Sequence, residues 1–297
     1  MTTRVYLSTA GRPLAPGEAT VSVFDRGFLY GDSVYETLRT AGGHPIEMTR
    51  HLVRLHRSAA GIGLTIPFSD DEIRDAVKRT CDDSGNPDSY IRIIITRGTG
   101  PIALDPRLSS APLLVVLVQS LALPDPKLYD AGLRVRIVEI TKISARALDP
   151  ALKTGNYLNS IQALRQAADG AAEDAILCNP AGHVAEGASS NVFMVKDGVL
   201  STPSLATGLL EGITRALVLA LARELGIEAR EAVILPDELR AADEVFLTSS
   251  IRGPMPVTIL DGQPVSAGDI GTVTRRVMQR YAAYIDGVAA GGPELLQ

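Results

Sequence analysis

The sequence is poor in several residue types, and each scarcity argues against a class of site. It contains no tryptophan, and aromatic residues make up 4% of its 297 positions. Its two cysteines, Cys81 and Cys178, have neither the number nor the spacing of a disulfide framework or a metal-binding motif. Two of its four histidines, His51 and His56, are five residues apart, which does not place them on one helical face. We therefore expect reduced thiols and no metal site.

Long apolar segments and an excess of positive charge are missing as well. No run approaches the ~18 apolar residues of a membrane-spanning helix, and the first residues lack the apolar stretch of a signal peptide. The net charge of −5 offers no basic surface for nucleic acid or an anionic membrane. With 45% hydrophobic and 21% charged residues, the composition is that of a globular protein. We expect a cytoplasmic protein with small-molecule ligands.

Periodicity predicts strands and helices in both halves of the chain. In the first half, short apolar runs and helical spacing predict strands within 4–40, at 90–98 and at 112–119, and helices at 48–64 and at 69–83, the second capped by Ser69. In the second half we expect strands at 134–140, within 174–203 and at 244–250, and helices at 157–168, from about Thr214 to Leu225 and after Asp269.

A segment with two prolines and few apolar residues, 122–132, separates the two halves and is the best linker candidate. We therefore predict an α/β (α+β) protein with a small domain at 1–120, an interdomain linker at 121–132 and a large domain at 133–297.

Lysine is scarce in this chain, and Lys153 stands directly before the small pair Thr154-Gly155 and a predicted helix. A helix N-terminus disfavours a protonated amine and so favours a nucleophilic one. A solvated lysine ahead of a helix fits the same pattern. By itself, the position of Lys153 does not decide between the two.

Two other features complement an amine. Glu186, between short apolar runs, is placed to pair with a pyridinium nitrogen, although a solvated turn carboxylate fits as well. The helix start Gly212-Ile213-Thr214 offers free N–H groups to a phosphate, although plain capping by threonine is the alternative. Ser249-Ser250, at a strand end, adds hydroxyl donors or is loop polarity. Amine, acid and anion cup together are what pyridoxal 5′-phosphate (PLP) chemistry requires.

Arginines supply two further candidates. Arg50, Arg54 and Arg57 share one helical face, which periodicity interprets as a solvated basic stripe. Tyr90 and Arg92 point to the same side of a predicted strand. A buried arginine requires an anionic partner, so Arg92 indicates either an internal ion pair or a carboxylate-binding wall.

Taken in order, these pieces closely resemble the fold-type IV PLP-dependent aminotransferases (class IV), which include branched-chain amino acid aminotransferases, D-amino acid transaminases and aminodeoxychorismate lyases. The resemblance covers nearly the whole chain and rests on the segments DRGFLYGDSVYETLR, HLVRLHRSA, IRIIITRGTGPIALDPR, KTGNYLNS, AEGASSNVFMVKDGVLSTP, LLEGITR and DEVFLTSS.

The resemblance implies PLP as cofactor and gives each candidate a role. Lys153 would be the lysine that bonds to the cofactor and then carries the proton. The other cofactor contacts it implies are Arg57 and the cup of Ile213, Thr214 and Ser250 for the phosphate, Tyr157 for the ring hydroxyl, Glu186 for the ring nitrogen, and Leu210 for packing on the ring.

Within the family, Tyr90-Ile91-Arg92 and LLEGITR are most similar to the branched-chain enzymes. The substrate side would be formed by Tyr30, Tyr35, Thr37, Arg39, Tyr90, Arg92 and Ile251. Thr37 stands where those enzymes usually have glycine, and the turn Ser249–Gly253, with Arg252, looks as much like the lyase or D-amino acid branches. Arg252 could add a second carboxylate contact or close the entrance.

The resemblance implies transfer of an amino group between a branched-chain or other apolar L-amino acid and 2-oxoglutarate. The alternatives of the same fold are a D-amino acid or (R)-amine transaminase and an aminodeoxychorismate lyase. It also implies a homodimer or higher homo-oligomer, with Tyr30 contributing to the neighbouring pocket.

Overall fold

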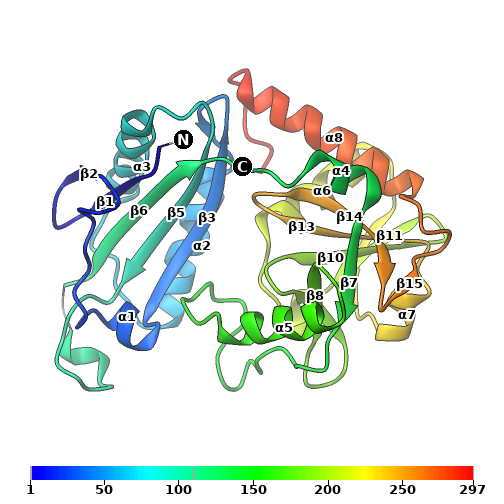
Figure 1. Cartoon of the computed structure of the whole chain (residues 1–297), viewed down its shortest axis with the longest axis horizontal. Coiled ribbons are helices and arrows are strands. Elements are labelled where there is room, and N and C mark those ends of the chain that lie inside the picture. Colours follow the sequence, from blue (N-terminus) through cyan, green and yellow to red (C-terminus); the bar gives the residue numbers. More distant parts are fainter. Residues whose placement is uncertain (1, 110, 297) are drawn as a thin grey trace.

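Two β-sheets with helices packed on them make up the protein, one on each side of Figure 1. The computed structural model describes residues 2–109 and 111–296. The last strand of the first sheet ends at Ser120, and the second sheet begins at Leu133. Between them, Pro126–Ala131 form a short helix, α4. The mixed α/β class is confirmed, and the division into domains at 121–132 stays a prediction.

The first sheet has six strands in the order β2-β1-β6-β5-β3-β4, and all neighbours are antiparallel. Their bounds are β1 Arg4–Leu7, β2 Arg12–Leu14, β3 Ser33–Ala41, β4 His44–Pro45, β5 Ser89–Thr96 and β6 Leu113–Ser120. The long runs of β3 and β5 pair directly, with Thr37 opposite Arg92.

Two helices cover this sheet, as the periodicity predicts. α2 (Met48–Gly61) buries Leu52 and Leu55 among apolar residues of β3, β5 and β6. α3 (Asp70–Ser84) begins with a capping box, in which the Ser69 hydroxyl accepts from the Glu72 N–H and the Glu72 carboxylate accepts in return.

The expectation of strands throughout residues 4–40 is wrong in one place. Residues Arg26–Tyr30 form the short helix α1, because Asp25 caps its first turn and Gly31 ends it in the left-handed conformation, at φ 67°. The helix turns the chain sharply into β3.

The second sheet has nine strands in the order β12-β11-β10-β13-β14-β7-β8-β9, and β15 pairs with β14. Their bounds are β7 Leu133–Ile137, β8 Asp174–Cys178, β9 Val184–Gly187, β10 Asn191–Lys196, β11 Val199–Pro203, β12 Ala229–Ala232, β13 Glu244–Ser249, β14 Gly253–Leu260 and β15 Gln263–Pro264. The pairs β11–β12, β14–β7 and β7–β8 are parallel, and the rest are antiparallel.

The helices of this half are α5 Leu158–Asp169, α6 Ile213–Glu224, α7 Pro236–Arg240 and α8 Thr272–Ala289, with one-turn 3₁₀ helices at Pro106–Leu108 and Leu205–Thr207. α6 and α8 cover β10 and β13, where Phe193 and Phe246 stack with ring centroids 4.9 Å apart. No helix in the described ranges is long and apolar enough to cross a membrane.

The two sheets are joined by an apolar cluster that places Ala41 and Ile46, from the first sheet's side, against α6 and α8. The buried carboxylate of Glu47 accepts hydrogen bonds from the Tyr284 hydroxyl of α8 (2.6 Å) and from the Leu295 and Leu296 N–H groups. The C-terminal segment therefore ends beside β3, where Figure 1 places the C-terminus.

Candidate active site

A cavity of about 350 Å³ is lined from both halves of the chain. The first half contributes from β3, α2 and β5, and the second from the segment 142–160, from β9, from the start of α6 and from the turn after β13. The predicted residues in its lining are Tyr35, Thr37, Tyr90, Arg92, Lys153, Tyr157, Glu186, Leu210, Ile213, Thr214, Ser250 and Ile251. Tyr30, Arg39 and Arg57 are not in the lining.

Lys153 is held by the first sheet. Its carbonyl accepts from the Tyr35 N–H (3.0 Å), and its own N–H donates to the Ser58 hydroxyl (3.1 Å). Gly155 lies so close to β3 that a Cβ there would collide with the Ser33 hydroxyl. The small residue after Lys153 is therefore required by packing against the strand.

The expectation that Lys153 stands at a helix N-terminus is wrong, because α5 begins at Leu158 and the intervening segment is bridged to β3 through Thr154 and Val34. The dipole of α5 is thus not the cause of its acidity. Burial, and then the positive charge of Arg54, lower the pKa of Lys153 to about 8. A substantial fraction of the amine is neutral at physiological pH.

Two tyrosines flank this amine. The Lys153 ammonium nitrogen lies 4.6 Å from the centroid of the Tyr35 ring, and the Tyr35 and Tyr157 hydroxyls are in contact. Burial, and then the charge of Glu186, raise the pKa of Tyr157 to about 12. Tyr157 therefore stays protonated and can donate a hydrogen bond to an oxygen in the cavity.

Glu186 lies within β9 and is buried, so the alternative of a solvated turn carboxylate is wrong. One carboxylate oxygen pairs with the Lys142 ammonium, and the other accepts from the Leu210 N–H (3.0 Å). Lys142 was not singled out in the sequence, although scarce lysines deserve inspection where arginine carries most of the surface charge.

Arg54, not Arg57, is the α2 arginine in the cavity lining. The Arg54 side chain is 6% exposed and bidentate to the Glu36 carboxylate (2.8 and 2.7 Å), whereas Arg57 is 45% exposed and pairs with Glu211 (2.5 Å). Three residues of helix turn the side chain by about 60°. That turn faces Arg57 to solvent, which corrects both the phosphate role implied for Arg57 and the solvated stripe predicted for Arg54.

Glu36 is the anchor of this arginine. It also accepts a hydrogen bond from His51 (2.7 Å). Burial acts to raise its pKa, but the charge and hydrogen bonds of Arg54, with that of His51, lower the pKa of Glu36 to about 2. Burial lowers the pKa of His51, so the ring is neutral and donates through Nδ1. The signal available in the sequence was a glutamate inside an apolar strand.

The start of α6 has the features of an anion site. Its N-cap is Gly212 and no side chain caps it, so plain capping by Thr214 is wrong. The Thr248 hydroxyl, also in the lining, is buried and has no hydrogen-bond partner among the described residues. Together with Arg54, these donors offer an anion backbone, hydroxyl and guanidinium contacts.

Arg92 has no acidic partner among the described residues. Its guanidinium stacks on Tyr35, 4.1 Å from the ring centroid, and lies 5.9 Å from that of Tyr157. Of the two interpretations of Arg92, an internal ion pair is wrong. By contrast, Arg252 at the rim is bound to the buried Asp174 (2.8 Å), and its carbonyl accepts from Tyr129.

Arg39 and Tyr30 lie outside this cavity. Arg39 is on the same face of β3 as Tyr35 but further along, where its charge acts on Tyr129 and Tyr281. Tyr30 stacks on Arg26 (5.1 Å) and lines a second cavity of about 310 Å³. Their predicted places in this chain's own pocket are therefore wrong.

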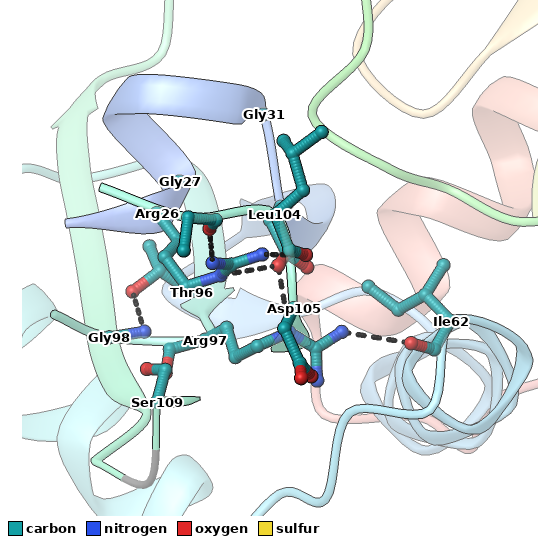
Figure 2. Close-up of polar contacts among 12 residues, drawn as sticks. Arg26, Gly27, Gly31, Ile62, Thr96, Arg97, Gly98, Leu104, Asp105 and Ser109 are labelled. Atoms are coloured by element: carbon teal, nitrogen blue, oxygen red, sulfur yellow. Dashed lines mark hydrogen bonds and ion pairs between the residues drawn. The ribbon is translucent and has the colours of Figure 1, made fainter. Parts of the chain in front are cut away.

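The second cavity is bordered by a cluster with two guanidinium groups and one carboxylate. Arg26 and Arg97 both donate to Asp32 (2.9 and 2.8 Å). Arg26 also binds the Leu104 carbonyl, and Arg97 reaches the Ile62 carbonyl at the end of α2 (Figure 2). The cluster thus ties the loop at 98–109 to α1 and α2, directly beside the segment that carries Lys153.

This chain belongs to the amino-transferase class IV family, whose model matches residues 33–260. It is 36% identical over 279 residues to a Methanocaldococcus jannaschii protein assigned as a branched-chain-amino-acid aminotransferase, covering 94% of this chain and 95% of that one. It is also 33% identical over 267 residues to the D-alanine aminotransferase of Bacillus licheniformis, covering 90% and 92%.

Its fold is similar to that of a branched-chain amino acid aminotransferase (from T.th.) complexed with N-(5'-phosphopyridoxyl)-L-glutamate. The TM-score is 0.89 at 29% identity, covering 97% of this chain and 95% of that one. The predicted membership of the class IV family, and the prediction of a branched-chain aminotransferase-like enzyme, are confirmed.

Proposed function

We propose that this enzyme uses PLP to move an amino group between a branched-chain or other apolar L-amino acid and 2-oxoglutarate. The observation that carries the proposal is the position of Lys153. Its amine, with a pKa of about 8, shares one cavity with an anion site at α6 and with the buried Glu186 carboxylate. A phosphorylated pyridine aldehyde matches these three groups.

The residues fit PLP by their own chemistry. Arg54, the N–H groups at the start of α6 and the unpartnered Thr248 hydroxyl would bind the phosphate. Glu186 would hold the ring nitrogen, and the protonated Tyr157 would donate to the ring oxygen. Ser250 and Leu210 also line the cavity and would complete the contacts.

When bound, PLP supplies the electron sink for the pair left on the substrate Cα. The chain supplies the proton transfer. The Lys153 amine takes the proton from Cα and returns it at the cofactor carbon, which is general base and then general acid chemistry. Arg92, free of acidic partners among the described residues, would bind a substrate carboxylate beside Tyr35 and Tyr157.

Two findings support the substrate classes. Tyr35, Ile143 and Leu148 give the lining apolar surface for an apolar side chain. The structurally similar branched-chain enzyme was solved with a phosphopyridoxyl adduct of L-glutamate, the amino form of 2-oxoglutarate. The match to the Bacillus licheniformis D-alanine aminotransferase favours D-amino acids as the second candidate.

A homodimer is the proposed assembly. The segments joined by Arg26 expose Phe28, Ile102 and Leu104, which are 71%, 75% and 78% exposed. An apolar surface of this kind is typical of protein–protein contacts. A monomer at micromolar concentration in analytical ultracentrifugation would contradict the assembly.

The test of the function is a half-reaction followed by absorbance. The PLP-loaded protein is mixed separately with L-leucine, D-alanine and (R)-1-phenylethylamine, and loss of the lysine-bound cofactor band is recorded. We expect rapid loss with L-leucine and little with the others. Loss mainly with D-alanine would establish the second candidate, and a protein that takes up no PLP would refute both.

The same assay tests Arg92. Because its guanidinium would bind the carboxylate, Arg92→Ala should raise the half-saturating concentration of L-leucine by about tenfold or more, at a cost of roughly 1.5–3 kcal/mol for a charged hydrogen bond. The carboxylate-free amine should be affected little. Equal losses for both ligands would make Arg92 structural.

A further inference from the structure

The buried pair of Lys142 and Glu186 has no part in the function as proposed above. The Lys142 and Glu186 side chains are 15% and 7% exposed. The Lys142 N–H donates to the Cys178 carbonyl at the end of β8 (2.8 Å), and β8 pairs with β9, which carries Glu186. The sheet therefore fixes the ammonium group beside the carboxylate.

The remaining surroundings of Glu186 are polar but contain no second ion-pair partner among the described residues. Its other oxygen accepts from the Leu210 N–H (3.0 Å) and from the Asn191 amide (3.4 Å). The other titratable groups that sense its charge are Lys153 and Tyr157. Lys142 is thus the cation that balances this carboxylate.

A cation in this place has a definite electrostatic effect. A carboxylate that faces a pyridine nitrogen favours the protonated ring, and a positive charge close to both disfavours it. In a buried site this effect is screened weakly. The strength of the electron sink depends on that proton.

We propose that Lys142 is a positioning residue, which fixes Glu186 toward the ring nitrogen of PLP and weakens the hold of Glu186 on the ring proton. This inference rests on the proposed function, because it requires PLP in the cavity. It adds that this chain moderates the cofactor through a buried ion pair.

The experiment follows the ring nitrogen itself. The protein is loaded with PLP labelled with ¹⁵N in the ring, and the ¹⁵N chemical shift is recorded against pH for the natural chain, Lys142→Met and Lys142→Gln. Removing the positive charge should move the ring titration to higher pH by about one unit, a tenfold gain in proton affinity. Lys142→Arg, which keeps the charge, should titrate like the natural chain.

The matched control is Lys196→Met, because Lys196 pairs with Asp243 on the surface and is 49% exposed. It should leave the ring titration unchanged. An unchanged titration in the loaded Lys142→Met or Lys142→Gln protein would overturn the inference. So would unfolding of both neutral variants with Lys142→Arg folded, which would make the pair structural. A natural chain that takes up no PLP would refute the proposed function instead.

Discussion

Lys153→Ala should abolish amino transfer, with kcat reduced by about 10³-fold or more, because it removes both the bond to the cofactor and the general base. The near-ultraviolet band of the lysine-bound cofactor should also disappear, although PLP can still bind through its phosphate. The measurements are steady-state kcat with L-leucine and the absorbance spectrum of the purified protein. A lysine-bound spectrum in the variant would show that another lysine forms the bond.

The natural chain provides a pH test of the same residue. The Lys153 amine accepts a proton only when it is neutral, and its pKa is lowered to about 8. The proton-transfer rate should therefore rise with pH and level off above about pH 8, falling tenfold per unit on the acid side. The surface variant Lys196→Ala should follow the same profile, and a rate independent of pH between 6 and 9 would contradict the assignment.

Glu36→Gln should destabilise the protein by about 3–5 kcal/mol, the usual consequence of removing one partner of a buried ion pair. The fully buried Glu36 carboxylate is bonded to Arg54 and His51, and the variant leaves the Arg54 guanidinium without its counter-charge. Urea unfolding of the cofactor-free protein measures the loss. PLP affinity should fall as well, because Arg54 would no longer be oriented toward the cavity.

The pH dependence of stability has a definite sign here. The pKa of Glu36 is lowered from 4.5 to about 2, so its contribution is present above pH 4.5 and is lost as pH falls toward 2. Glu36→Gln should flatten the stability curve in that window. The control Asp82→Asn removes an exposed pair with Lys78 and should change neither stability nor its pH dependence measurably. A Glu36→Gln curve that matches the natural one would assign the buried cluster no energetic role.

The sequence by itself determined the elements whose signals are local. Helical spacing and the Ser69–Glu72 capping box defined α3, and long β-branched runs defined β5 and β6, because periodicity and capping act between residues close in the chain. The order of the long motifs also determined the class IV family, since several matches in one order exclude chance.

Only the tertiary structure decided which side chains share the cavity. It placed Arg54 inward and Arg57 outward, and gave Glu36 and Lys142 their buried partners. It also removed Arg39 and Tyr30 from the pocket lining. Each of these outcomes depends on residues far apart in the chain. The acidity of Lys153 is an example, because the N-terminal dipole of a nearby helix was the local explanation, whereas burial and Arg54 are the actual causes. Periodicity identifies the face of an element, but only packing decides what that face contacts.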